Sequence, residues 1–152
     1  MPREQACRGS GMSLAVLLFP LLPLTIAAAA DLRSRRIPDL VPVCLIANAL
    51  VASGFGWAGI RPWMVITGIL LGLLLGLMLF HWAKLGGGDV KLIVGIGALL
   101  GPAGLLFFVF WMAVAGGGLA LLALKRGRRD YAYGPAILLG YMAWLWWPGG
   151  LF

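Results

Sequence analysis

Apolar residues form six long runs that are separated by short polar segments. The runs cover residues 13–30, 40–55, 63–83, 90–101, 103–124 and 134–148. A helix needs about 20 apolar residues to cross a bilayer, and most of the runs approach this length. Nearly every charged residue lies between the runs. The pattern therefore predicts an all-α, polytopic membrane protein with about six transmembrane helices.

The apolar stretch from Val90 to Leu124 is too long for one span, so its division matters for the count. Gly101-Pro102 is the natural break, because proline cannot continue a helix and disfavours helix in the residue before it. The break leaves Val90 to Leu100 as a short fourth segment. We expect this segment to be tilted or partial, or else to begin before Asp89.

Composition and charge support this interpretation. Hydrophobic residues make up 62% of the 152 residues and charged residues only 11%, which excludes both a soluble globular domain and a disordered chain. In such a chain the net charge of +7 reports topology, and we expect no nucleic-acid partner. With six spans, segments 31–39, 84–91 and 125–130 share one side and carry nine basic residues: Arg33, Arg35, Arg36, Lys84, Lys91, Lys125, Arg126, Arg128 and Arg129. The other side receives Arg3, Arg8 and Arg61, so the positive-inside rule predicts a cytoplasmic location for the nine and an outside location for both termini.

The N-terminal region allows more than one interpretation. We expect a single transmembrane domain over residues 1–152, in which residues 1–12 form a poorly structured extension. The first apolar run also resembles a signal peptide, but cleavage after Ala30 would move the basic residues at 33–36 outside, against the charge rule. Met12 is an alternative start.

Glycines recur every four residues in the third run, at Gly68, Gly72 and Gly76. Small residues at this spacing allow helices to approach closely. We prefer packing within one chain as the explanation, and a homodimer interface stays open. The two cysteines, Cys7 and Cys44, have neither the spacing nor the neighbours of a metal site or a disulfide framework.

Two of the five acidic residues need a special explanation. Asp31 and Asp89 each lie where an apolar run meets a segment of the predicted cytoplasmic side, and ionisable groups at a membrane boundary are candidates for function. There are plainer alternatives. Asp89 is well suited to be the N-cap of the fourth helix, and Asp31 has basic neighbours at 33–36 that would neutralise it. Charge placement alone leaves a paired-carboxylate site and two interfacial charges both open.

The sequence around these two residues favours the paired site. Asp89 lies in GGGDVKL at 86–92, where three glycines leave it unshielded, and Asp31 begins DLRSRRIPDL at 31–40. With these motifs, and with YAYGPAI at 131–137, the chain resembles the type IV prepilin peptidases. These are membrane aspartic proteases of the GxGD class, and the chain resembles in particular the short form of Flp/Tad pilus systems. The residues that match the family motifs are Asp31, Arg36, Ile37, Pro38, Gly86, Gly88, Asp89, Lys91 and Leu92.

The resemblance implies a function and a site. Asp31 and Asp89 would be the catalytic pair, supported by Gly86, Gly88, Lys91, Arg36 and Pro38, with no metal and no cofactor. The substrate would be a prepilin or pseudopilin whose basic leader is removed at the cytoplasmic face of the bacterial inner membrane, among membrane lipids. Asp39 stands where the family usually has Asn, and nothing corresponds to the N-methyltransferase domain of the longer members, so methylation is not implied. A non-catalytic assembly subunit of a pilus or secretion system, or a small ion-coupled transporter, remains as an alternative.

Overall fold

The computed structural model describes residues 16–34, 37–83, 85–125 and 134–146, and these residues form helices and no strand. The elements are α2 (Leu21–Ser34), α3 (Leu40–Gly54), the short 3-10 helix η1 (Trp57–Gly59), α4 (Pro62–Ala83), α5 (Gly87–Lys125) and α6 (Gly134–Trp146). Three stretches are long and apolar enough to cross a membrane, namely Val16–Ser34, Pro62–Trp82 and Gly87–Lys125, and α3 and α6 are shorter apolar helices. The predicted all-α membrane protein is confirmed. The expected extension at 1–12 lies outside the described residues.

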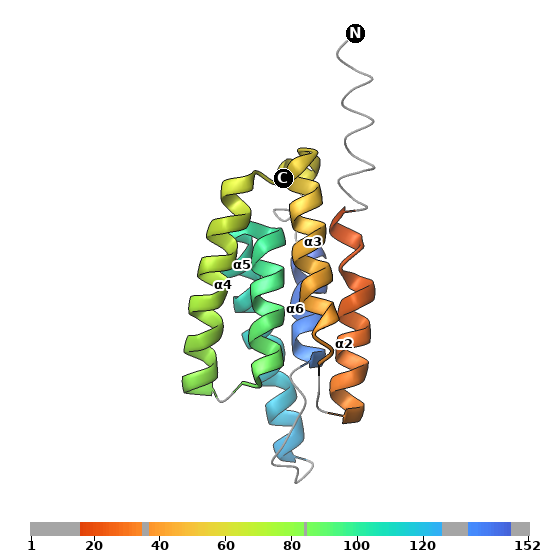
Figure 1. Ribbon diagram of the computed structural model, residues 1–152. Coiled ribbons are helices and arrows are strands. Elements are labelled where there is room, and N and C mark those ends of the chain that lie inside the picture. The colour runs from red at the N-terminus through yellow and green to blue at the C-terminus, as the bar shows by residue number, and fades with distance from the viewer. Residues whose placement is uncertain (1–15, 35–36, 84, 126–133, 147–152) are drawn as a thin grey trace.

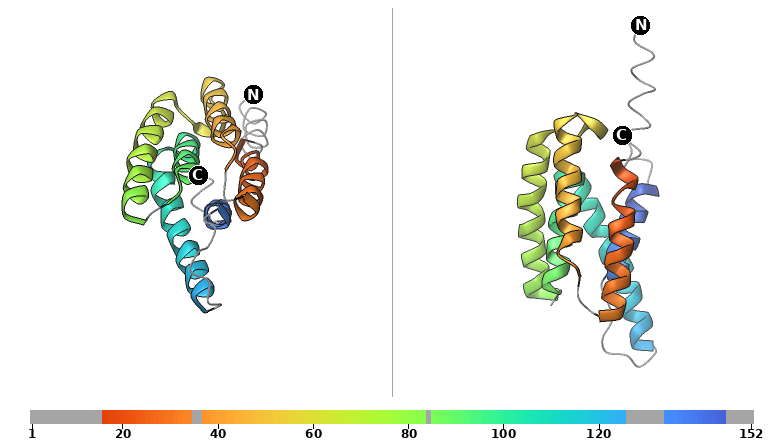
Figure 2. Two further views of the ribbon diagram at one scale, coloured as in Figure 1. Left: turned by 60° about the horizontal axis from the view of Figure 1, so that its bottom comes forward. Right: turned by 45° about the vertical axis from the view of Figure 1, so that its right-hand side comes forward.

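The long helix α5 is broken at Gly101. Its φ of 68° and ψ of −178° lie in a region that is essentially restricted to glycine, and Pro102 follows. The first half of α5 runs antiparallel to α4, since Gly68 packs beside Gly97 and Gly76 beside Val90, whereas the second half packs against α6 at Gly140. Figures 1 and 2 show the second half returning toward the end of the bundle at which α5 begins. The predicted break is therefore confirmed, and the fourth segment begins at Gly87, before Asp89.

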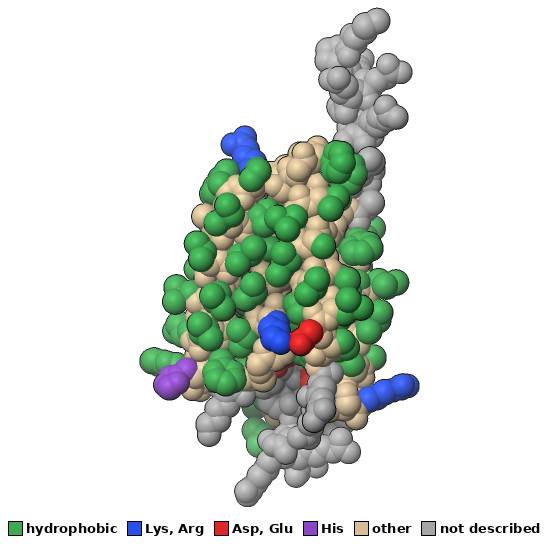
Figure 3. All heavy atoms as spheres, in the orientation of Figure 1, with side chains coloured by type: hydrophobic (Ala, Val, Ile, Leu, Met, Phe, Trp, Pro, Cys, Tyr) green, Lys and Arg blue, Asp and Glu red, His purple; other side chains and the backbone are tan. Residues whose placement is uncertain are grey.

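This reversal gives the described chain six apolar helical segments that alternate in direction. The ends of α2, α4 and α5 and the beginnings of α3, α5 and α6 all lie at one end of the bundle, which is the lower end in Figure 1 and is called here the polar end. In Figure 3 most of the coloured charged side chains lie toward the polar end, one basic side chain lies at the opposite end, and apolar side chains are spread over the face between them. The segments predicted to share a side, 31–39, 84–91 and 125–130, adjoin helix ends at the polar end, as six spans require.

The first half of α5 is the central helix of the bundle. Its side chains are buried almost without interruption, with Leu92, Ile93 and Ile96 at most 1% exposed. The helix α4 lies beside it and turns large apolar side chains outward, among them Leu70 and Leu74, which are more than 60% exposed. An apolar outer face of this kind would be a liability in water and is suited to contact with lipid.

The glycine ribbon of α4 faces this central helix. A Cβ atom added at Gly68 would overlap the carbonyl oxygen of Gly97, and one at Gly72 would lie 3.0 Å from the Cα atom of Val94. The preferred explanation, close packing within one chain, is confirmed. A homodimer stays a prediction, and this ribbon is not available to form it.

Candidate active site

Asp31 lies in the last turn of α2 and is buried, with 8% of its surface exposed. An acid at this position faces the negative end of its own helix dipole. The compensation comes from α6: the backbone N–H of Gly134 donates to Oδ2 of Asp31 over 2.7 Å, in a buried contact between residues 103 positions apart. No ion pair reaches Asp31 within the described residues. Neutralisation by Arg33 is therefore not observed, and Arg35 and Arg36 lie outside the described part of the chain.

Asp89 lies in the first turn of α5 and is 6% exposed. The helix begins at Gly87, so Asp89 is not the N-cap that the plainer interpretation allowed. Its Oδ2 accepts a hydrogen bond of 3.2 Å from the backbone N–H of Gly86, the residue that precedes the helix. Its Oδ1 is buried and has no hydrogen-bond partner among the described residues. A buried carboxyl oxygen without a partner is costly, so its presence calls for an explanation.

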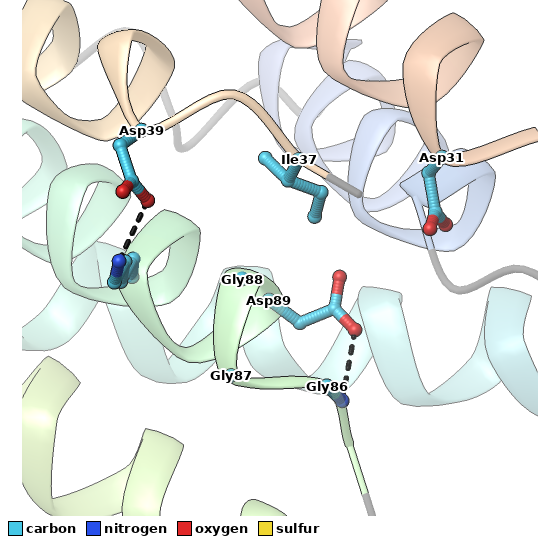
Figure 4. A pocket seen from close by; sticks show the side chains of 8 residues that line it. Asp31, Ile37, Asp39, Gly86, Gly87, Gly88 and Asp89 are labelled. Atoms are coloured by element: carbon cyan, nitrogen blue, oxygen red, sulfur yellow. Dashed lines mark hydrogen bonds and ion pairs between the residues drawn. The ribbon is translucent and has the colours of Figure 1, made fainter. Parts of the chain in front are cut away.

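Asp31 and Asp89 line the same hollow, which has a volume of about 310 Å³ and lies at the polar end. Its lining comes from three parts of the chain: Asp31, Ile37, Asp39, Gly86, Gly87, Gly88, Asp89 and Lys91. Figure 4 shows the carboxyls of Asp31 on α2 and Asp89 on α5, with Ile37 between Asp31 and Asp39 in this view. Two carboxyl groups from distant segments therefore share a partly enclosed space. Like charges at close range oppose simultaneous ionisation, so such a pair is suited to holding one proton between two groups.

A third acid, Asp39, lines the hollow but already has a partner. Its Oδ1 lies 2.6 Å from Nζ of Lys91, and both side chains are more than half exposed. This ion pair joins the residue before α3 to the first turns of α5 (Figure 4). Among the described residues no three His, Cys, Asp or Glu side chains form a candidate metal site.

The predicted supporting residues fall around this hollow as far as they are described. Gly86 and Gly88 both line it. A Cβ atom at Gly88 would lie 3.0 Å from Cβ of Ile37, so glycine here lets the segment before α3 approach α5 closely. Pro38 precedes α3, and its carbonyl oxygen accepts the N–H of Val41 in the first turn of that helix. Arg36 lies outside the described residues.

The comparison with protein families decides the general class. A model of the type IV leader peptidase family matches residues 17–121, more than half of the chain. The chain belongs to the type IV leader peptidase family. Neither the curated proteins nor the solved structures contain a significant match to it. The match includes both Asp31 and Asp89, and together with the apolar helices it supports a peptidase embedded in a membrane.

Sequence reasoning missed one part of this candidate site. The motif at 131–137 pointed to the beginning of the last span, but not to a contact between Gly134 and Asp31. The available signal was the Gly-Pro pair at 134–135, since a glycine beside a proline at a helix start often marks a close approach. Only the packing of α6 against α2 identifies what approaches it.

Proposed function

We propose that the protein is an aspartic endopeptidase in which Asp31 and Asp89 form the catalytic pair. The observation that carries the proposal is that two buried carboxyls from separate helices line one hollow at the polar end. Oδ1 of Asp89 adds support, because it has no partner among the described residues and such an oxygen is available to water or to a substrate carbonyl. Membership of a peptidase family indicates the reaction of such a pair, which is the hydrolysis of a peptide bond.

The mechanism begins with one proton shared by the two carboxyl groups, so that one is ionised and the other is protonated. The ionised carboxylate accepts a proton from a water molecule while the water oxygen attacks the scissile carbonyl carbon. The protonated carboxyl donates its proton to the carbonyl oxygen, which gives a neutral tetrahedral intermediate. When the C–N bond breaks, the carboxyl that took the water proton donates it to the leaving amine, and the other carboxylate takes a proton from a hydroxyl of the intermediate, so the pair returns to its starting state. No covalent intermediate is needed.

The proposed substrate is an Flp-type prepilin or pseudopilin, cut after a glycine where its basic leader meets its apolar stem. The nine basic residues of segments 31–39, 84–91 and 125–130 are predicted to be cytoplasmic, which favours a cytoplasmic location for the hollow, at the inner membrane. A leader of the substrate would lie on that side and its stem within the bilayer, so the junction would reach the depth of the carboxyls. Gly87 lines the hollow, and a Cβ atom there would meet nothing within 4 Å, which leaves room for an extended peptide backbone.

The supporting residues would hold the hollow in shape. Gly88 permits the contact with Ile37, and the Lys91–Asp39 pair ties the segment before α3 to α5. In this proposal Gly86 orients Asp89 through its N–H. Pro38 precedes α3 and accepts a hydrogen bond from the first turn of that helix through its carbonyl oxygen. Arg36 belongs to the same proposed set on the basis of the motif alone.

Co-expression with a candidate Flp-type prepilin tests the proposal, with the mass of the prepilin as the readout. We expect the wild type to remove the leader at a glycine, and Asp31→Asn and Asp89→Asn each to leave the prepilin intact although the enzyme is inserted in the membrane. Asp39→Asn is the matched control, since it makes the same chemical change at an exposed acid that already pairs with Lys91, and it should still cleave. Normal cleavage by Asp31→Asn or Asp89→Asn would refute the catalytic pair.

The two alternative functions predict different results. An assembly subunit would leave the prepilin uncut in the wild type as well, and its aspartate variants would behave like the wild type in pilus assembly. A transporter would give proton-dependent uptake in vesicles. Transporters usually hold their carboxylates near the middle of the membrane, whereas these two lie at one end of the bundle, which favours the peptidase.

A further inference from the structure

The proposed pair is built from α2 and α5, yet one of its carboxyls is held by α6. The hydrogen bond from the Gly134 N–H to Oδ2 of Asp31 is short, buried and formed at the first residue of α6. Gly134 lies beyond the 17–121 segment that matches the family model. The last helix therefore takes part in the geometry of the site, although no side chain of α6 lines the hollow.

The charge distribution of a helix explains why the beginning of α6 is suited to hold the Asp31 carboxylate. The first N–H groups of a helix have no partner within the helix, and together they carry a partial positive charge. Asp31 lies at the C-terminal end of α2, which carries a partial negative charge. The N-terminal end of α6 supplies the partial positive charge that favours a carboxylate. Pro135 has no N–H, so it offers no competing donor next to Gly134. Among the described residues, the Gly134 N–H is therefore the donor that α6 offers to this carboxylate.

The absence of a side chain at Gly134 is required for this contact. A Cβ atom there would lie 2.9 Å from both Cβ and Oδ2 of Asp31, and 3.1 Å from the Cα atom of Ala28. Two of these three atoms are a Cα and a Cβ, which cannot move without shifting α2. Any other residue at 134 must therefore separate α6 from α2 or turn the carboxyl group of Asp31 away.

A second contact in the site repeats the arrangement. Asp89 is held by the N–H of Gly86 at the beginning of α5, also through Oδ2. Each carboxyl thus has one oxygen bound to a glycine N–H at a helix start, which leaves its other oxygen for the reaction. We propose that Gly134 is a positioning residue, whose N–H fixes the Asp31 carboxyl in the orientation that pairs it with Asp89. This inference rests on the proposed catalytic role of Asp31.

The test compares Gly134→Ala with Gly72→Ala in the purified full-length enzyme, using the detergent-solubilised prepilin of the co-expression experiment. Both substitutions add one methyl group at a tight helix contact, but Gly72 lies between α4 and α5, away from the hollow. We expect Gly134→Ala to lower kcat by about 10-fold to 100-fold with KM changed less than about 2-fold, because a misplacement near 1 Å is enough for such a loss. Gly72→Ala should lower the thermal midpoint and keep the kcat of the wild type. A folded Gly134→Ala enzyme with the kcat of the wild type would overturn the proposal.

A second comparison keeps the test decisive if Gly134→Ala does not fold. Asp31→Asn retains an oxygen that accepts the Gly134 N–H, whereas Asp31→Ala does not. We expect the thermal midpoint of Asp31→Ala to lie at least about 2 °C below that of Asp31→Asn. Equal midpoints would contradict a bond that holds Asp31.

The activities of the aspartate variants separate this inference from the proposed function. If Asp31→Asn cleaves the prepilin, the catalytic pair is wrong and the positioning role falls with it. If Asp31→Asn is inactive while a folded Gly134→Ala keeps its full kcat, the pair stands and only the positioning role is wrong.

Discussion

The contact between α4 and α5 makes the sharpest prediction about stability, because the two helices approach through glycine at Gly68. A Cβ atom added there would overlap the carbonyl oxygen of Gly97 and lie 2.7 Å from its carbonyl carbon. Both are backbone atoms of the central helix, so no side chain can rotate to make room. The substitution Gly68→Ala must therefore push α4 away from α5.

The expected cost can be worked out from two opposing effects. Overpacking a tight contact costs about 1–3 kcal/mol, and a clash with backbone belongs at the upper end of that range. Alanine recovers about 1 kcal/mol through its better helix propensity. The net loss is about 2 kcal/mol, which corresponds to a fall of about 4–8 °C in the thermal midpoint for a chain of this size.

The control substitution is Gly117→Ala in the second half of α5. A Cβ atom at Gly117 would meet nothing within 4 Å, so this change should leave the midpoint where it is or raise it. The assay is thermal unfolding in one detergent, followed by tryptophan fluorescence for both variants. If Gly68→Ala unfolds at the temperature of the wild type or above it, the close approach of α4 and α5 is wrong.

Two further predictions concern the helix break and the exposed ion pair. Gly101→Ala should lower the thermal midpoint by the equivalent of about 1–3 kcal/mol, because its backbone conformation is strained for alanine although space is available; a midpoint equal to that of the wild type would contradict the break. Breaking the Asp39–Lys91 pair by Asp39→Asn, Lys91→Gln or both should show a coupling below about 1 kcal/mol in a double-mutant cycle, because both side chains are exposed. A larger coupling would mean that the pair is shielded from solvent.

Much of the site could be anticipated from the motifs around Asp31 and Asp89, and the structure brings both residues to one hollow. The role of Asp39 could not, since a sequence gives no measure of which acid Lys91 will meet across 52 positions. The same holds for Gly134. Its contact with Asp31 depends on α6 packing against α2, and nothing local to either helix specifies that neighbour.

The sequence by itself determined the number of apolar helical segments in the described part of the chain and which of their ends lie together at one end of the bundle. This was possible because both properties depend on the order of residues along the chain. The length of an apolar run decides whether it spans the bilayer, and the basic residues beside it decide on which side of the bilayer its ends lie. It also located the break at Gly101-Pro102, where backbone chemistry is local. The tertiary structure alone decided which helices are neighbours, and therefore that Gly68 meets Gly97 and Gly134 meets Asp31. Those contacts arise from the fit of whole helix surfaces, which lipid on the outside does not dictate.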